Sequence, residues 1–225
     1  MRNLNDFSAI IFDMDGLVLD TESTYFAAWQ QTAKVMGYSL SDAFCLSLSG
    51  LHYKEIELKL LACCGAEFNL DTFTRLSGIF WREQVKAHGI KIKHGFTELL
   101  EFIVQQQIPY CLATNSSTVN AYECLEFAGL REIFSTVITR DDVEHGKPAP
   151  DIFLKAAELL QVQISQCLVL EDSYTGIEAA SRAGAFSVLI PSTEPVDPMA
   201  LALCDVMMID LAQTLMALKA ECRVD

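Results

Sequence analysis

The stretch from Ile10 to Glu22 constrains this chain more than any other. An apolar run, typical of a buried strand, ends there in two carboxylates, Asp13 and Asp15, and Gly16 follows at once. Side chains alternate along an extended chain, so we expect both carboxylates to face the same small volume. Two carboxylates in one volume repel each other unless a cation or a proton separates them. The cation would be Mg2+, which takes oxygen ligands, and the proton would be one carried by an acid catalyst. An acidic turn without any function has the same residue types and is the alternative.

Apolar runs and helical patterns alternate along most of the chain. The expected strands cover residues 8–12, 108–113, 136–139, 167–170, 186–190 and 206–209. The expected helices that follow them cover residues 96–106, 118–127, 150–160, 176–183 and 212–222. This alternation predicts βαβ units, and therefore an α/β fold with a parallel sheet that carries helices on both faces.

Residues 19–88 follow a different pattern. After Glu22, apolar side chains recur at three- and four-residue steps, and further helical patterns cover residues 44–48, 54–64 and 71–88. We see no strand pattern between them. We therefore predict a helical domain at residues 19–88, inserted into a core domain formed by residues 1–18 and 89–225.

Composition limits the compartment and the partners. The formal net charge of −14 argues against nucleic acid and against an anionic membrane surface. No apolar run approaches the roughly 20 residues of a membrane span, and the first residues lack the apolar stretch of a signal peptide. We therefore expect a cytoplasmic protein. The eight cysteines are scattered without zinc spacing, and we expect them to be reduced thiols.

Polar residues lie at the ends of three expected strands. These are Asp13 and Asp15 after the first strand, Thr114 and Asn115 after the second, and Glu171 and Asp172 after the fourth. In open parallel sheets, ligands bind beyond the carboxyl ends of the strands. We therefore expect the three groups to meet at one edge of the sheet.

A phosphate ester is a substrate that needs these groups together. Asp13 would be the nucleophile and would form an aspartyl-phosphate. Asp15 would protonate the leaving group and then deprotonate water. Because an anion attacks an anion, Mg2+ has to lie between them, and Asp172 and Glu171 would hold it.

Two further motifs fit this chemistry. Thr114 and Asn115 would bind the phosphoryl group through hydroxyl and backbone N–H groups. Lys147, in a loop stiffened by prolines, would supply positive charge to the transition state. Each motif alone is also typical of a helix cap or a surface turn, but their occurrence together, in this order, favours the site.

The set of motifs resembles the haloacid dehalogenase superfamily, in the subgroup with a helical cap after the first strand. The residues that carry the resemblance are Asp13-Met14-Asp15-Gly16, Thr114-Asn115-Ser116, Lys147-Pro148-Ala149-Pro150-Asp151, and Glu171-Asp172-Ser173 with Gly176-Ile177-Glu178-Ala179-Ala180 following. The resemblance implies a Rossmann-like core with the nucleophile strand at its centre, an inserted α-helical cap and Mg2+-dependent phosphoryl transfer. It also implies that Thr114, Asn115 and Ser116 bind phosphate, and that the backbone carbonyl of Asp15 is a metal ligand.

Within the superfamily, the chain looks similar to the β-phosphoglucomutases and to the sugar-phosphate phosphatases. Dehalogenases lack the second aspartate, so Asp15 excludes dehalogenation. The mutases carry a histidine where this chain has Tyr25, and an arginine where it has Tyr53. We therefore predict a phosphatase of a small phosphorylated metabolite. A hexose-phosphate mutase, in which His52 or Lys54 replaces the arginine, and a non-catalytic sensor of a phosphorylated ligand are the alternatives.

The helical domain is expected to select the substrate. The residues that we assign to specificity are Gly50, His52, Tyr53 and Lys54. Hinges are expected at residues 16–20 and 88–95, where glycines tolerate a change of backbone angles. We interpret Tyr25, Phe26 and Trp29 as helix-packing residues, and we expect a monomer or a weak homodimer.

Overall fold

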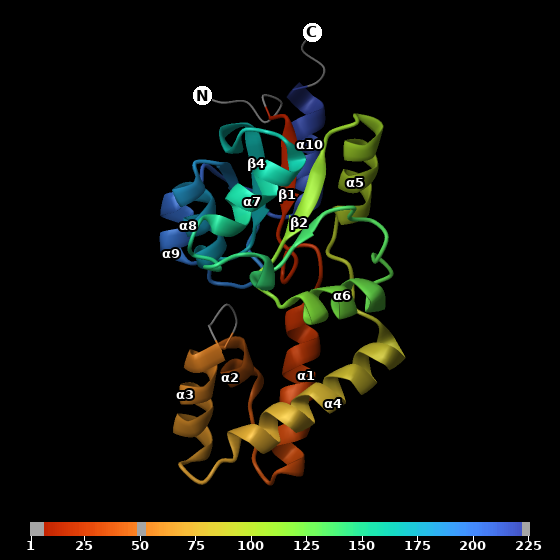
Figure 1. Cartoon of the computed structure of the whole chain (residues 1–225). Helices are drawn as coiled ribbons and strands as arrows, with labels where there is room; N and C mark the ends of the chain where they lie inside the picture. Colours follow the sequence, from red (N-terminus) through yellow and green to blue (C-terminus); the bar gives the residue numbers. More distant parts are fainter. Residues whose placement is uncertain (1–6, 49–52, 222–225) are drawn as a thin grey trace. The chain divides into compact units, whose positions relative to one another are not determined.

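The computed structural model describes residues 7–48 and 53–221, which form two compact units (Figure 1). One unit comprises Met1–Leu19 and Lys91–Asp225, and the other comprises Asp20–Ile90. Among the described helices, none combines the length and the apolar character that a bilayer crossing requires.

The larger unit is built on a six-stranded sheet. Its neighbouring strands are all parallel, in the order β3-β2-β1-β4-β5-β6. The strands are β1 (Ala9–Phe12), β2 (Tyr110–Ala113), β3 (Val137–Ile138), β4 (Cys167–Glu171), β5 (Phe186–Leu189) and β6 (Val206–Met207). β1 lies between β2 and β4, with Phe12 opposite Leu112 on one side and Leu170 on the other. The prediction of an α/β fold with a Rossmann-like parallel sheet is confirmed.

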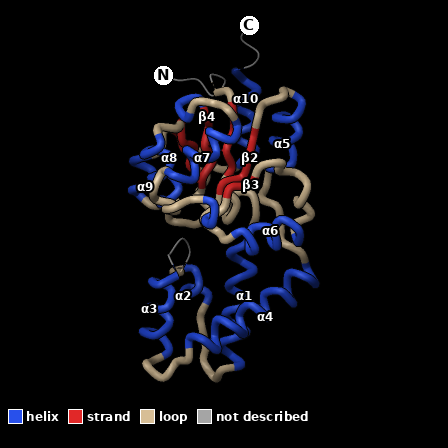
Figure 2. Tube along the Cα trace, viewed as in Figure 1, coloured by secondary structure: helices blue, strands red, loops and turns tan. Residues whose placement is uncertain are grey.

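Helices cover both faces of this sheet (Figure 2). They are α5 (Phe96–Gln105), α6 (Thr118–Phe127), α7 (Asp151–Leu160), α8 (Tyr174–Ala183), α9 (Pro198–Leu203) and α10 (Leu211–Glu221), with short 3-10 helices at Arg140–Asp142 and Ile164–Gln166. On one face, Ile11 belongs to a buried cluster that includes Phe153 of α7 and Ala180 of α8. On the other face, the ring of Phe12 meets that of Phe96 in α5 at 5.6 Å between centroids. Burial on both faces explains why β1 is apolar at every position.

The described residues of the smaller unit form helices joined by turns and loops, without a strand. Its helices are α1 (Thr21–Val35), α2 (Asp42–Leu46), α3 (Tyr53–Cys64) and α4 (Leu70–His88). The ring of Tyr25 stacks on that of Trp81 in α4, with 5.5 Å between centroids and 13° between planes. The ring of Trp29 also contacts those of Tyr25 and Phe26, with 6.2 and 5.9 Å between centroids. These contacts confirm the packing role predicted for the three aromatic residues of α1.

Several helices begin elsewhere than predicted, and side-chain caps explain where. α2 begins at Asp42 because Ser41 accepts a hydrogen bond from the Phe44 N–H at 3.1 Å. α8 begins at Tyr174 because Ser173 caps the Gly176 N–H at 3.1 Å. α9 is absent from the prediction, although an Asp197 cap followed by a proline at the first helical position is a recognisable start signal.

Candidate active site

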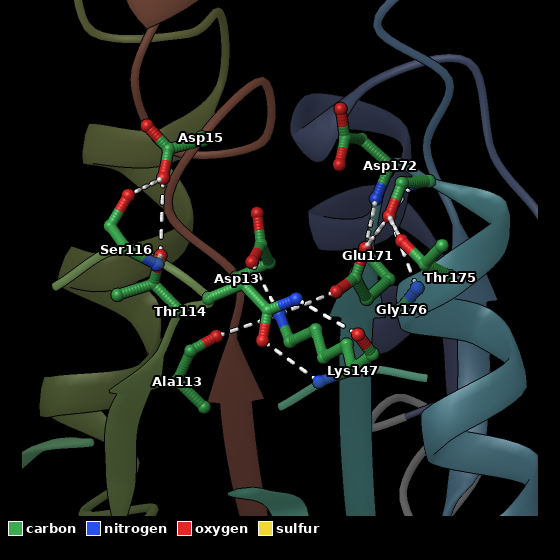
Figure 3. A network of polar contacts seen from close by, with 12 residues as sticks. Asp13, Asp15, Ala113, Thr114, Ser116, Lys147, Glu171, Asp172, Thr175 and Gly176 are labelled. Carbon is green, nitrogen blue, oxygen red and sulfur yellow. Dashed lines mark hydrogen bonds and ion pairs between the residues drawn. The ribbon is translucent and has the colours of Figure 1, made fainter. Parts of the chain in front are cut away.

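At the carboxyl ends of three adjacent strands, β2, β1 and β4, polar residues lie at one edge of the sheet. Asp13 follows β1, Thr114 follows β2, and Glu171 is the last residue of β4. Figure 3 shows these residues around the side chain of Lys147, which comes from the loop before α7. The convergence expected from the sequence is therefore present in the larger unit.

The Lys147 ammonium is the centre of this network. Its side chain is almost fully buried, and the Nζ atom lies 2.5 Å from Asp13 Oδ1 and 2.6 Å from Glu171 Oε1. It also donates to the carbonyl oxygen of Ala113 at 2.9 Å. An ammonium group has three N–H donors, and in the described structure each has an acceptor in the protein. Lys147 therefore holds the ends of β1, β2 and β4 together.

Glu171 is held as firmly as Lys147. The residue is fully buried, and its Oε2 atom accepts hydrogen bonds from the Asp172 N–H, the Ser173 N–H and the Ser173 hydroxyl at 3.0, 3.2 and 3.0 Å. Its carboxylate lies against Gly176, where any Cβ atom would clash with it. Ser173 and Gly176 belong to the fourth motif of the sequence, but no role at the site was assigned to them there; the structure shows that both hold Glu171 in place.

Three carboxylates form a cluster with the geometry of a cation site. One oxygen from each of Asp13, Glu171 and Asp172 lies within 4.8 Å of the others. Lys147 supplies one positive charge against these three carboxylates, so negative charge is in excess. Carboxylate oxygens in such a group are the ligands that Mg2+ prefers, and the donor set therefore fits this ion.

Burial and charge shift the ionisation of the two central groups. Burial raises the pKa of Asp13 to about 8; Lys147 opposes this shift, while Glu171 and Asp15 add to it. Burial alone would lower the pKa of Lys147, but the neighbouring carboxylates of Asp13 and Glu171 outweigh it and raise that pKa above its ordinary value. Lys147 is therefore an ammonium ion at neutral pH.

Asp15 lies near Asp13 but has different partners. Its Oδ2 atom accepts hydrogen bonds from the hydroxyls of Thr114 at 3.1 Å and Ser116 at 2.9 Å. The strand ends at Phe12, so strand alternation does not govern the Asp13–Asp15 pair as the sequence reasoning assumed. One oxygen of Asp13 faces Lys147, and the other points away, toward the side on which Asp15 and Asp172 lie (Figure 3).

The remaining predicted residues fall into two groups. The side-chain amide of Asn115 pairs with the backbone of Lys147, a contact that nothing in the sequence indicates. In the helical unit, Tyr53 begins α3 and Lys54 is exposed in its first turn. Gly50 and His52 lie outside the described residues.

Known proteins are similar to this chain over most of its length. The phosphorylated carbohydrates phosphatase of Thermotoga maritima is 32% identical over 176 residues, which cover 78% of this chain and 81% of that protein. The β-phosphoglucomutase of Bacillus subtilis is 28% identical over 194 residues, which cover 84% of this chain and 85% of that protein. A crystal structure of a HAD-family hydrolase from Deinococcus radiodurans, with bound phosphate and sodium, is 25% identical and has a TM-score of 0.79, with 96% of each chain covered.

The match to a family extends over most of the chain. Residues 10–190 match the haloacid dehalogenase-like hydrolases, and this range contains Asp13, Lys147 and Asp172. It also contains the whole of the smaller, helical unit. The chain therefore belongs to the haloacid dehalogenase-like hydrolase family.

Proposed function

We propose that this protein is a Mg2+-dependent phosphatase that removes phosphate from a small phosphorylated metabolite, such as a sugar phosphate, through an aspartyl-phosphate intermediate. The observation that carries the proposal is the cluster of Asp13, Glu171 and Asp172 oxygens within 4.8 Å, beside the buried Lys147 ammonium. The Thermotoga maritima relative is named for phosphorylated carbohydrates, which supports the substrate class.

In this proposal Asp13 is the nucleophile. Its Oδ2 atom, the oxygen that does not face Lys147, attacks phosphorus, and the ester P–O bond breaks as the bond to Asp13 forms. Lys147 holds Asp13 Oδ1, so the other oxygen is offered in a single orientation. Asp15 gives a proton to the leaving oxygen and then takes one from the water that attacks phosphorus. Inorganic phosphate leaves, and the carboxylate of Asp13 is restored.

The remaining groups would bind the phosphoryl group and the metal. Mg2+, held by Asp13, Glu171, Asp172 and the backbone carbonyl of Asp15, would neutralise charge on the transferring phosphoryl oxygens. Another set, made of Thr114, Asn115 and Ser116, would bind these oxygens through hydroxyl and backbone N–H groups. In the structure each hydroxyl donates its single proton to Asp15, so the hydroxyls would turn from Asp15 to the phosphoryl oxygens when the substrate binds.

We further propose that residues 19–88 act as a cap that selects the leaving group. The helical unit runs from Asp20 to Ile90, so its limits fall close to the two proposed hinges at residues 16–20 and 88–95. Gly50, His52, Tyr53 and Lys54 remain the proposed specificity residues.

A hexose-phosphate mutase is the second candidate, because a β-phosphoglucomutase is among the relatives. Such a mutase has to keep a bisphosphate intermediate and exclude water as the acceptor. Tyr25, which stands where the similar mutases carry a histidine, is engaged in stacking with Trp81. This supports hydrolysis over transfer between two positions of a sugar.

The test is a phosphate-release screen over sugar phosphates and other monophosphates, with and without Mg2+. We expect Mg2+-dependent release of inorganic phosphate from at least one ester. Interconversion of a sugar 1-phosphate and 6-phosphate, stimulated by a bisphosphate, would instead establish the mutase. Tight binding of a phosphorylated ligand in Mg2+ without any turnover would contradict both and indicate a sensor.

A further inference from the structure

The side chain of Asn115 makes two hydrogen bonds to the backbone of one residue. Its Nδ2 atom donates to the Lys147 carbonyl oxygen at 3.0 Å, and its Oδ1 atom accepts from the Lys147 N–H at 2.8 Å. The amide thus pairs with Lys147 much as a neighbouring strand would. One bond is accepted and the other donated, and the oxygen and NH2 group of the amide match both backbone groups at once.

Residue 146, which precedes Lys147, is a glycine, and the absence of a side chain there gives the Asn115 amide the space that this pairing needs. A Cβ atom on Gly146 would lie 2.5 Å from Asn115 Oδ1. Further side chains hold the same loop on both sides. Arg140 donates to the carbonyl oxygens of Val143 and Glu144 at 2.9 and 3.0 Å, and Arg182 donates to that of Pro148 at 3.2 Å.

Lys147 is consequently held at both ends. Asn115 fixes its backbone, while Asp13, Glu171 and the Ala113 carbonyl fix its ammonium. Four methylene groups separate the two ends, so the Nζ atom reaches Asp13 only from a limited range of backbone positions. The loop that carries Asn115 also carries Thr114, whose hydroxyl donates to Asp15.

We propose that Asn115 is a positioning residue for Lys147. Its side-chain amide fixes the position of the Lys147 backbone, and the Lys147 ammonium in turn fixes the orientation of the Asp13 carboxylate. The inference rests on the proposed phosphatase function, in which the backbone N–H of Asn115 binds the phosphoryl group and its side chain has this separate task. One loop would therefore place both the lysine and the acid Asp15 relative to the phosphoryl group.

The test compares two variants of similar shape. Asn115→Leu keeps the volume and loses both hydrogen bonds, whereas Asn115→Asp keeps the acceptor and sets an oxygen against the Lys147 carbonyl. Asn69→Ala, which removes an N-cap of α4, is the control for a loss of stability alone. For each variant, kcat, KM, inhibition by inorganic phosphate and Tm are measured with the best ester from the screen.

We expect both Asn115 variants to lose about 10²-fold in kcat, the usual result of misplacing a reacting group by about 1 Å. KM and inhibition by inorganic phosphate should stay near the wild-type values. A rise in KM and weaker phosphate inhibition at unchanged kcat would mean that the amide binds phosphate and would overturn the proposal. Wild-type kcat in Asn115→Leu, with or without a lower Tm, would overturn it as well.

A second measurement does not depend on activity. The Lys147 N–H is protected by Asn115 Oδ1, so its hydrogen exchange, followed by NMR, should be at least about 10-fold faster in Asn115→Leu and unchanged in Asn69→Ala. Unchanged exchange in Asn115→Leu would refute the inferred pairing. If the wild-type protein hydrolyses no ester while exchange at Lys147 does respond, the proposed function fails and the positioning contact stands.

Discussion

Gly176 lies directly against the carboxylate of Glu171: a Cβ atom on Gly176 would fall 1.8 Å from Glu171 Oε1. Helix α8 approaches the end of β4 this closely only because residue 176 has no side chain. The contact is part of what fixes Glu171, whose Oε1 atom accepts a hydrogen bond from Lys147 at 2.6 Å. Gly176, which contacts no substrate in the proposed reaction, is thus linked through Glu171 to Lys147.

Gly176→Ala should therefore lower both activity and stability. Alanine normally stabilises a helix by about 1 kcal/mol relative to glycine, but here its methyl group would displace Glu171 or push α8 from the sheet. We expect kcat/KM to fall at least about 10-fold and Tm to fall. Steady-state kinetics and thermal unfolding measure these two effects.

Gly78→Ala is the matched control for that substitution. Gly78 also lies inside a helix, α4, and a Cβ atom there would have Arg82 Nη1 at 3.8 Å as its nearest neighbour. We expect unchanged activity and a slightly higher Tm, since helix propensity alone acts there. If both glycine variants behave alike, close packing against Glu171 does not matter.

Gly16→Ala should weaken Mg2+ binding. A Cβ atom on Gly16 would lie 2.1 Å from Asp172 Oδ2, and its φ of +87° disfavours any other residue. Displacing Asp172 should raise the Mg2+ concentration for half-maximal activity by about 10–100-fold. Gly37→Ala has the same φ of +87° with no atom within 4 Å, so it should lower Tm and leave the Mg2+ requirement unchanged. An equal Mg2+ requirement in both variants would exclude a role of Asp172 as a ligand.

Asp13→Asn should abolish phosphate release and preserve the fold. The neutral amide has almost the same shape but cannot attack phosphorus, so kcat should fall by at least about 10⁴-fold. Circular dichroism should show the wild-type helix content. Asp71→Asn, in the exposed first turn of α4, should keep full activity. Near-normal turnover of Asp13→Asn would remove Asp13 from the nucleophile role.

Mg2+ should stabilise the protein in a pH-dependent way. The crowded carboxylates repel each other, and Mg2+ at 100 times its Kd should add about 2.7 kcal/mol to the free energy of unfolding. Burial raises the pKa of Asp13 to about 8, so at neutral pH the ion has to displace a proton from that site. The Mg2+ concentration that gives half of the maximal Tm shift should therefore fall as the pH rises from about 6 to about 8.

Two comparisons check this expectation. Asp172→Asn should show a smaller Tm shift with Mg2+ because it loses one charged ligand, and treatment of the wild-type protein with EDTA should stop phosphate release. A Tm that does not respond to Mg2+ at any pH would argue against a metal at the Asp13, Glu171 and Asp172 cluster.

Local sequence patterns were sufficient to predict the order of helices and strands along the chain. They were also sufficient to predict the edge of the sheet at which the polar residues meet. Alternation and helical periodicity depend on near neighbours in the chain, so the predicted helix at residues 118–127 coincides with α6. The rule that parallel strands present their carboxyl ends together then brought Asp13, Thr114 and Glu171 to one edge without any coordinates. The short helix α9 was missed because its six residues make little more than one helical turn.

The alternation of apolar runs and helical patterns was thus enough to predict a parallel sheet, and with it the chemical groups that lie at one edge of that sheet. How these groups pair depends on the folded unit: Lys147 pairs with Asp13 across 134 positions, Asn115 with the Lys147 backbone across 32, and Thr114 with Asp15 across 99. The reason is physical. A hydrogen bond depends on distances within a few tenths of an ångström and on side-chain rotamers, and these are set by the packing of the whole unit rather than by residues nearby in the chain.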